Sequence, residues 1–562
     1  MTAIIKNNKD NIKDNVKIAV FSLGCKTNYY EGMAIASRLN ELGLNAVEGL
    51  VPADVYVINT CAVTAEAEGK SRQCISRALK LNKEAKIFLV GCAVEHDKEQ
   101  FLSKERVVYL AGNADKMKVA EKIAFLLAAE NTYTDTRHKE KAQDYAPPAH
   151  KLFTDNLSEE TADFSLACEE GNTNQRNKAV WSKVAARRQA PSSYTREIIA
   201  DSRHNGKMPL KTVEGGDLSA DKLTALTNAD FKNNLFYQTP PQENTGCNGF
   251  IKAQNPLTSA EDTAPIAPDK PLDFSIAPPS RARRYVKIQD GCDNFCSYCI
   301  VPYLRGRSAS RSIKEIVQEV KGVKEKEIVL IGIDISQFGR ENGETLAGLF
   351  DALDFFGGRI RLGSLYQNAI NEKLLIAMKG KGCAHFHLSL QSGCDQTLKR
   401  MNRHYTAKDY FNAVTLIRSF YPDAAICADV IVGFCGESAE EFAQTYDFIE
   451  KVGFADVHIF PYSPRKGTAA YAWKTPSGKE IGERVEKLTL LKNKLTTAFT
   501  QKALALKEAQ VLIEEEKGGY SIGYTDNYVK VYIKEKLQIG EFANVIPLKA
   551  FKEGMLAAPA KI

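Results

Sequence analysis

The stretch GCDNFCSYCIVPYLRG, Gly291 to Gly306, carries three cysteines in the spacing CxxxCxxC. Cysteine thiolates at this density suit iron–sulfur clusters or zinc. A structural zinc site usually has four protein ligands, whereas this stretch supplies three cysteines and no neighbouring histidine. Three thiolates can hold three irons of a 4Fe–4S cluster and leave the fourth iron open to a ligand. The pattern favours such a cluster, with zinc as the alternative.

The cysteine stretch follows the first of six strand candidates that alternate with amphipathic helices between residues 281 and 505. Six parallel β/α units are enough for a partial barrel, in which chemistry occurs at the carboxyl ends of the strands. The CxxxCxxC stretch lies at such an end. The strand candidates are Arg284–Cys292, Glu327–Ser336, Arg359–Leu365, His385–Gly393, Ala425–Phe434 and Ala455–Ser463.

Residues 1–130 show the same alternation. Three strand candidates each end on a cysteine, at Cys25, Cys61 and Cys92. Strict alternation implies a parallel sheet built from right-handed crossovers. The carboxyl ends of parallel strands share one edge, where ligands bind, so we expect these distant cysteines to converge. The sequence therefore predicts a second three-cysteine group.

Between residues 131 and 280 the composition changes, and twelve of the chain's 20 prolines fall here. Such a segment buries too little apolar area to offset its ordering entropy, so we expect a long, mostly disordered insertion with a short helix near Ala179–Arg188. A small domain with its own core is the alternative. Cys168 and Cys247 have no partners at ligand spacing and are interpreted as incidental thiols.

Residues 506–562 contain short strand candidates separated by turns. This pattern predicts a small antiparallel β-barrel, a common platform for RNA. Aromatic rings there are suited to stacking on bases, and a cation to neutralising phosphate. An aromatic barrel core is the alternative for any single tyrosine. The candidate RNA-binding residues are Tyr520, Tyr524, Tyr528 and Lys530.

The composition limits the class of protein. A chain of 562 residues is too long for one ordinary core. The net charge of +6 is compatible with a polyanionic partner but does not require one. Neither a signal peptide nor a run of about 18 apolar residues is visible, so we expect a cytoplasmic protein without a membrane span. Thirteen cysteines in such a chain favour metal ligation or redox chemistry over disulfides.

Six motifs follow one another along the chain: GCKTNYYE at Cys25, INTCAV at Cys61, VGC at Cys92, IQDGCDNFCSYCIVPYLRGR, HFHLSLQSGCDQTLKRMNR and YSPRKGTAA. Together they resemble the methylthiotransferase family of radical S-adenosylmethionine enzymes. The resemblance covers nearly everything except the insertion. It implies a cluster domain at 1–130, a radical barrel at 281–505 and an RNA-binding TRAM domain at 506–562.

The resemblance also implies the chemistry. One 4Fe–4S cluster cleaves S-adenosylmethionine to a 5′-deoxyadenosyl radical, which removes a hydrogen from the substrate carbon. A second cluster presents sulfur, which another S-adenosylmethionine methylates, so that the product carries a thiomethyl group. The implied catalytic cluster ligands are Cys292, Cys296 and Cys299 for the radical cluster, and Cys25, Cys61 and Cys92 for the other.

Further residues are candidates for holding S-adenosylmethionine, because they lie at or near the ends of later strands or beside the last cluster cysteine. Glycine among them lets a backbone approach a ligand, although it also makes ordinary turns. These candidates are Tyr298, Ser389, Gln391, Asp429, Gly433, Glu437, Phe460, Tyr462 and Ser463.

Within the resembled family, branches act on threonylcarbamoyladenosine in tRNA, on isopentenyladenosine in tRNA, or on an aspartate of a ribosomal protein. The motif GCK, followed by Asn28, Tyr30 and Glu31, is most similar to the threonylcarbamoyladenosine branch. The implied partner is therefore the tRNA anticodon stem-loop, besides an electron donor and a sulfur source that the sequence does not name. Lys26 either meets the carboxylate of that substrate or is a solvated loop residue. A non-catalytic cluster-binding or RNA-binding homologue is the remaining alternative.

The chain departs from the family pattern at Tyr366 and Gln367, which replace an acidic residue and proline, and at Cys435, which replaces a proline. None of these is expected to touch a cluster ligand. The other cysteines are interpreted as buried apolar residues, and two histidines on one strand as structural. These residues are Cys74, Cys383, Cys394, Cys427, His385 and His387.

Overall fold

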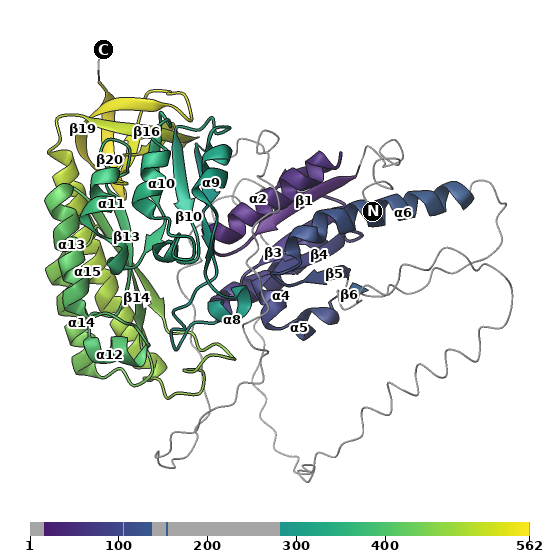
Figure 1. Cartoon of the computed structure of the whole chain (residues 1–562), viewed down its shortest axis with the longest axis horizontal. Helices are drawn as coiled ribbons and strands as arrows, with labels where there is room; N and C mark the ends of the chain where they lie inside the picture. The colour runs from purple at the N-terminus through teal and green to yellow at the C-terminus, as the bar shows by residue number, and fades with distance from the viewer. Residues whose placement is uncertain (1–15, 105, 138–152, 155–281, 561–562) are drawn as a thin grey trace, which may run out of the picture. The chain divides into compact units, whose positions relative to one another are not determined.

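The computed structural model describes residues 16–104, 106–137, 153–154 and 282–560, and the statements below concern these residues (Figure 1). Most of the predicted insertion lies outside them, including the helix predicted near Ala179–Arg188, Cys168 and Cys247. No helix in the described ranges is both long and apolar enough to cross a membrane.

The N-terminal residues form a six-stranded parallel sheet. Its strands are β1 (Lys17–Ser22), β2 (Asn45–Glu48), β3 (Val55–Thr60), β4 (Lys86–Gly91), β5 (Val107–Ala111) and β6 (Phe153–Thr154). Their spatial order is β2-β1-β3-β4-β5-β6. The three predicted strands are β1, β3 and β4, and they are adjacent, so the predicted parallel sheet is confirmed. The sequence did not reveal β2, β5 and β6, which are short.

Five helices accompany this sheet: α2 (Lys26–Glu41), α3 (Ala65–Leu81), α4 (Cys92–His96), α5 (Glu99–Leu102) and α6 (Val119–Arg137). Side chains alternate between the faces of a strand, so each face packs against its own helices. Val55 and Val57 of β3 pack with α2 and α6, whereas Tyr56 and Ile58 pack with α3 and α5. Helix α6 and strand β6 extend beyond residue 130.

Residues 282–504 form the predicted partial barrel of parallel strands. The strands are β7 (Arg283–Lys287), β10 (Glu327–Ile331), β11 (Arg359–Leu362), β12 (Ser364–Leu365), β13 (His385–Gln391), β14 (Ala425–Val432) and β15 (Asp456–Pro461). They follow one another in chain order, β7-β10-β11 in one sheet and β12-β13-β14-β15 in the next. All six predicted strands are present, one of them divided into β11 and β12.

The barrel helices are α8 (Val301–Arg305), α9 (Ile313–Val320), α10 (Leu346–Ala352), α11 (Glu372–Ala377), α12 (Asp395–Arg400), α13 (Ala407–Phe420), α14 (Ala439–Val452) and α15 (Gly478–Leu504). Helices α13 to α15 run along the outside of β13 and β14 (Figure 1). Four helices begin with a capping box, which satisfies free N–H groups of the first turn. The capping residues are Ser312, Thr406, Ser438 and Ser477.

The C-terminal residues form a closed five-stranded barrel in the order β16-β17-β18-β20-β19. The strands are β16 (Ala509–Lys517), β17 (Tyr520–Tyr524), β18 (Lys530–Ile533), β19 (Phe542–Phe551) and β20 (Gly554–Pro559). All pairings are antiparallel except β18 with β20, so the prediction is confirmed apart from that pair. Gly518 and Gly519, with φ of 61° and 77°, make the two-residue turn between β16 and β17.

Candidate active site

The CxxxCxxC loop lies after the short strand β8 (Gln289–Asp290) and before α8. A Cβ at Gly291, whose φ is 69°, would lie 1.9 Å from the carbonyl oxygen of Arg307, so only glycine fits there. Farther along, Ser297 donates through its backbone to Met401 (3.0 Å) and through its hydroxyl to the Arg400 carbonyl (2.8 Å). The loop is therefore held at its start and in its middle.

Polar side chains from the loop itself and from two other segments point at two of the loop's sulfur atoms. Asn294 donates to Cys292 Sγ (3.4 Å), as does Gln337 (3.9 Å). Arg403 Nη1 donates to Cys296 Sγ (3.6 Å). Donors aimed at sulfur favour the thiolate and are a means by which proteins tune iron–sulfur clusters. Neither Gln337 nor Arg403 was among the predicted site residues, because both lie far from the loop along the chain.

Tyr366 contacts a predicted cluster ligand, so the expectation that this departure from the family pattern would not do so is wrong. Its hydroxyl lies 3.7 Å from Cys296 Sγ and accepts a hydrogen bond from Arg403. Gln367 is buried beside it. Cys435 is also buried, and its thiol lies 3.6 Å from the Ala470 carbonyl oxygen, in a contact that involves no cluster cysteine.

The three loop thiols are suited to sharing a metal centre. Burial raises the pKa of Cys292 to about 12, with Asp334 adding to the effect. Burial and the neighbouring Cys296 likewise raise the pKa of Cys299. Each ionised thiol would disfavour ionisation of the next, so the group loses all its protons only when a cation is shared. Coordinated iron supplies that cation, and the residues therefore fit a 4Fe–4S cluster.

The second group of cysteines converges as predicted at one edge of the N-terminal sheet. Cys25 directly precedes α2, Cys61 directly follows β3, and Cys92 begins α4 after β4. Burial raises the pKa of Cys61 to about 12, and charges on Cys25 and Cys92 raise it further. The three thiols are therefore close enough to influence one another.

Two glycines permit this convergence. Gly24 has φ of 86°, and a Cβ there would lie 2.4 Å from Cys61 Sγ. Gly91 has φ of 95°, and a Cβ there would lie 2.5 Å from Asn59 Oδ1. Any larger residue would meet both an unfavourable backbone conformation and a collision.

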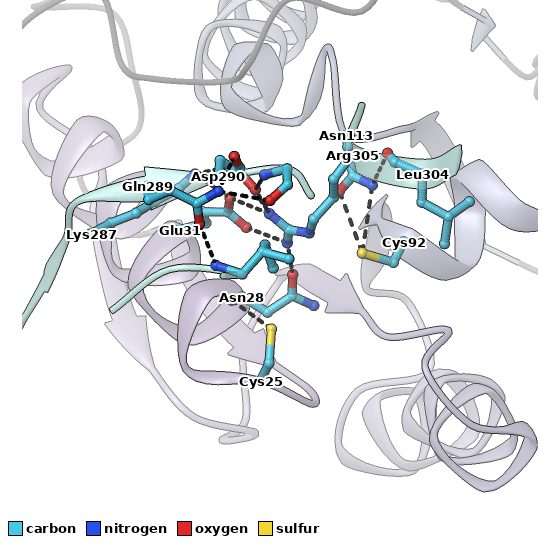
Figure 2. Close-up of polar contacts among 12 residues, drawn as sticks. Cys25, Asn28, Glu31, Cys92, Asn113, Lys287, Gln289, Asp290, Leu304 and Arg305 are labelled. Carbon is cyan, nitrogen blue, oxygen red and sulfur yellow. Dashed lines mark hydrogen bonds and ion pairs between the residues drawn. The ribbon is translucent and has the colours of Figure 1, made fainter. Parts of the chain in front are cut away.

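A buried network of charges connects the N-terminal cysteines with the segment after the CxxxCxxC loop (Figure 2). Arg305 of α8 donates to Glu31 (3.0 Å), Asp290 (3.0 Å) and the Asn28 side-chain oxygen (2.7 Å). Glu31 also accepts from Lys287 (2.8 Å) and from Lys116. Burial alone would raise the pKa of Glu31, but Arg305, Lys116 and Lys287 outweigh it and lower the pKa well below its usual range.

The network reaches the sulfur atoms directly. Asn113 donates to Cys92 Sγ (3.5 Å) and to the carbonyl oxygen of Leu304 (2.8 Å), the residue before Arg305. The positive charge of Arg305 opposes the rise in the pKa of Cys25 that burial causes.

Three cations, Lys116, Lys287 and Arg305, face two carboxylates, Glu31 and Asp290, in this network. The remaining positive charge favours an anionic group at the adjoining cysteines, as thiolates around iron would be. The second group of cysteines therefore also fits a cluster.

A cavity of about 910 Å³ opens beside Cys25. Lys26 lines it from the N-terminal domain, and Arg361 from barrel strand β11. Burial lowers the pKa of Lys26 to about 8, with Arg361 as the next cause. The volume lies in the range of small-molecule sites.

One cluster on the cavity wall escaped detection in the sequence, where the histidines show no ligand spacing. Asp429 lies 3.2 Å from His387 Nε2 and 3.1 Å from His458 Nδ1. Hydrogen bonds to Asp429 and Asp456 raise the pKa of His458 to about 9. His385 also lines the cavity, and its Nε2 lies 3.5 Å from the thiol of Cys427. The predicted burial of Cys427 and of the other three remaining cysteines, Cys74, Cys383 and Cys394, is confirmed.

The predicted RNA-binding residues are divided between two places. Tyr524, Tyr528 and Lys530 line the cavity, and the two tyrosine rings stack with centroids 4.5 Å apart. Tyr520 instead packs against Tyr532 and Phe551 of the C-terminal barrel.

The candidates for holding S-adenosylmethionine are equally dispersed. Asp429 is on the cavity wall, and Phe460 is 43% exposed. Glu437 is buried and pairs with Arg484 (2.6 Å), while Ser463 accepts from the backbone of Ala65 (3.1 Å).

The other candidates lie around the carboxyl ends of β13 to β15. The backbone carbonyl of Ser389 accepts a hydrogen bond from Arg403. Gln391 and Gly433 have positive φ angles, of 66° and 74°. The rings of Tyr298 and Tyr462 both pack on Phe434.

Comparison with known families gives two matches. Residues 286–449 match the Radical SAM superfamily, and residues 17–112 match the uncharacterized protein family UPF0004. The matched ranges contain the CxxxCxxC loop and the three N-terminal cysteines, respectively.

Two curated relatives align with nearly the whole chain. The threonylcarbamoyladenosine tRNA methylthiotransferase MtaB of Chlamydia pneumoniae is 29% identical over 91% of this chain and 89% of its own length. The protein of the same name from Bacillus subtilis is 27% identical over 95% of this chain and 94% of its own length. The tRNA-2-methylthio-N(6)-dimethylallyladenosine synthase of a Thermoanaerobacter species is 36% identical over only 51% of this chain and 62% of its own length.

Among solved structures, the radical S-adenosylmethionine methyltransferase TsrM of Kitasatospora setae aligns with 81% of this chain and 77% of its own, at 12% identity and a TM-score of 0.43.

Proposed function

Because this chain belongs to the methylthiotransferase family of radical S-adenosylmethionine enzymes, we propose that it attaches a methylthio group to a modified adenosine of tRNA. The observation that carries the proposal is the presence of two separate groups of three cysteines, one in the CxxxCxxC loop and one at the edge of the N-terminal sheet. In each group, burial and the neighbouring thiols raise the pKa of a cysteine, so the group loses all its protons only when it shares a cation such as iron. A protein that only bound RNA would need neither group.

The two groups take different roles in this proposal. Cys292, Cys296 and Cys299 hold the cluster that reacts with S-adenosylmethionine, and the N-terminal cysteines hold the one that presents sulfur. When bound, the clusters and S-adenosylmethionine supply the electron, the radical, the sulfur and the methyl group. The chain holds the loop cysteines in place through Ser297, stabilises the thiolates with Arg403, and excludes water by burial.

The domains divide the work accordingly. We assign the sulfur-presenting site to residues 1–130, the radical site to 281–505 and RNA binding to 506–562, with the tRNA anticodon stem-loop as the partner. Since the proposed substrate is tRNA, we also propose a cytoplasmic location. The dispersed residues named above for S-adenosylmethionine and for RNA stay predictions.

The proposed substrate is threonylcarbamoyladenosine, which becomes its 2-methylthio derivative. The relatives that align end to end bear that substrate in their names. Dimethylallyladenosine is the second candidate, because relatives named for it are more identical, at 36%, over about half of the chain. The charged lining of the cavity beside Cys25 suits a substrate with a carboxylate better than one with a hydrocarbon tail.

Mass spectrometry of nucleosides from tRNA tests the proposal, in cells with and without this protein. We expect deletion to remove 2-methylthio-threonylcarbamoyladenosine and to leave the unthiolated nucleoside in its place. Loss of 2-methylthio-dimethylallyladenosine instead would establish the second candidate. Unchanged tRNA in both respects would refute a tRNA substrate and point to a protein target or to a non-catalytic homologue.

A further inference from the structure

Arg361 is a buried cation without a counter-charge in the part of the chain that the structure describes. Its side chain is 6% exposed, and no described residue forms an ion pair or a hydrogen bond with it. Its guanidinium lies over the ring of Tyr528, whose centroid is 3.5 Å from Cζ. A buried guanidinium is unfavourable unless an anion or several acceptors satisfy it. Arg361 lines the cavity, so a ligand can supply the missing anion.

Lys26 is a second cation in the same cavity. It follows Cys25 as the first residue of α2, and its side chain has no ion pair with any residue in the described ranges. Lys26 and Arg361 line the same cavity. Two like charges that face one space are most stable when an anion lies between them.

The carboxylates on the cavity wall do not meet this need, because each already has partners. Asp429 lies between His387 and His458. Asp456 pairs with Lys492 (3.0 Å), and Glu553 pairs with Lys530 (2.7 Å). The unpaired charge in the cavity is therefore positive and resides on Lys26 and Arg361.

We propose that Lys26 and Arg361 bind the carboxylate of the substrate's threonylcarbamoyl group and so determine which modified adenosine the enzyme accepts. This inference rests on the proposed function, since the nucleoside it concerns is the proposed substrate. Cys25 and Lys26 line the same cavity, so a nucleoside held by its carboxylate lies beside the N-terminal cysteines. A dimethylallyl group would leave both cations unpaired, and sites built for a polar group reject analogues that lack it.

The same two cations would also suit a phosphate of the RNA backbone. A cavity of about 910 Å³ that reaches Cys25 favours a whole nucleoside over a backbone group at the protein surface. Binding measurements with free nucleosides separate the two sources of negative charge, because a nucleoside has a carboxylate but no phosphate.

The test measures equilibrium binding to the reconstituted full-length enzyme. The probes are N6-threonylcarbamoyladenosine, its threoninamide analogue, adenosine and adenosine 5′-monophosphate. We expect the wild type to bind the carboxylate form about tenfold to a hundredfold more tightly than the amide, as for a charge-assisted pair. Lys26→Met should abolish most of this preference, and Lys26→Arg should retain it.

Lys492→Met is the matched control. Lys492 also lines the cavity, but it is paired with Asp456, so its removal should leave the preference for the carboxylate intact. Arg361→Gln is a second test, and thermal denaturation shows whether that buried substitution folds. Lys26 is the first residue of α2, and its side chain makes no ion pair with any described residue, so Lys26→Met removes no ion pair of the fold and keeps the inference testable if Arg361→Gln does not fold.

Equal binding of the acid and the amide by the wild type would overturn the inference, as would an unchanged preference in Lys26→Met. Preference for adenosine 5′-monophosphate over adenosine, without preference for the carboxylate, would assign the cations to RNA phosphate instead. The tRNA analysis is independent. If deletion removes 2-methylthio-threonylcarbamoyladenosine from tRNA but the enzyme shows no preference for the carboxylate, only the inference fails. If deletion leaves the amount of that nucleoside unaltered, the proposed function itself is refuted.

Discussion

The two groups of three cysteines are built in opposite ways. Cys292, Cys296 and Cys299 lie in one loop of the barrel, where local turns and a glycine at Gly291 determine the geometry. Cys25, Cys61 and Cys92 come from three strand ends and meet only because β1, β3 and β4 are adjacent and parallel. A local motif can be recognised from spacing alone. A dispersed one depends on the fold, and it should be the more sensitive to changes elsewhere in the structure.

Removing one cysteine from each group should separate their functions completely. We expect Cys296→Ala to abolish reductive cleavage of S-adenosylmethionine, because we assign to that loop the cluster that reacts with it. Cys61→Ala should keep the cleavage and lose methylthio transfer. Product analysis of both reactions and iron content test this, with about eight irons per wild-type chain. Retained cleavage in Cys296→Ala would sink the radical assignment.

Replacing Arg305 should destabilise the buried network beside the N-terminal cysteines. Arg305→Met leaves Glu31 and Asp290 buried with one fewer cation, and breaking a buried ion pair costs about 3–5 kcal/mol. We expect a lower urea midpoint and loss of iron from the N-terminal group first. Arg307→Met is the control, since the side chain of Arg307 is 59% exposed and should matter little. Equal midpoints for the two variants would show that the network does not support the fold.

The sequence predicted the elements that local pattern determines. Local pattern predicts strand β3 from its continuous apolar run, and it predicts the six barrel strands. The order of strands and helices predicts that the N-terminal cysteines converge at one edge of a sheet. The sequence did not predict Arg305 as the centre of a network, because Glu31 is 274 positions away along the chain. Contacts of this kind depend on how two domains pack, and no periodicity encodes them.

The contact between Tyr366 and Cys296 was missed for the same reason, at a separation of 70 positions. The unpaired state of Arg361 is also invisible in the sequence, because it follows from what surrounds the side chain in three dimensions. The grouping of the six candidate cluster cysteines was thus predictable, while the residues that contact their sulfur atoms were not.

Gly24 tests how tightly the dispersed group depends on its backbone. Gly24→Ala adds a methyl group 2.4 Å from Cys61 Sγ at φ of 86°. We expect the free energy of unfolding to fall by about 2–3 kcal/mol, because backbone strain and overpacking add together. We also expect less iron in the N-terminal group. Gly43→Ala is a matched control, with φ of 82° and no atom within 4 Å of the new methyl group, so it should cost only about 1 kcal/mol. Equal iron content in the two variants would contradict a role for close packing at Gly24.

The smallest expected effects are on reduction potential, and they should be confined to one group each. Tyr366→Phe removes the hydroxyl beside Cys296, and Asn113→Leu removes the donor to Cys92. Hydrogen bonds to sulfur stabilise the reduced, more negative cluster, so each loss should lower one potential by about tens of millivolts. Redox titration followed by electron paramagnetic resonance measures both potentials in the same sample. The two sites are built separately, so we expect each variant to change the reduction potential of one cluster only. If either variant shifted both potentials equally, the two clusters would be electrostatically coupled.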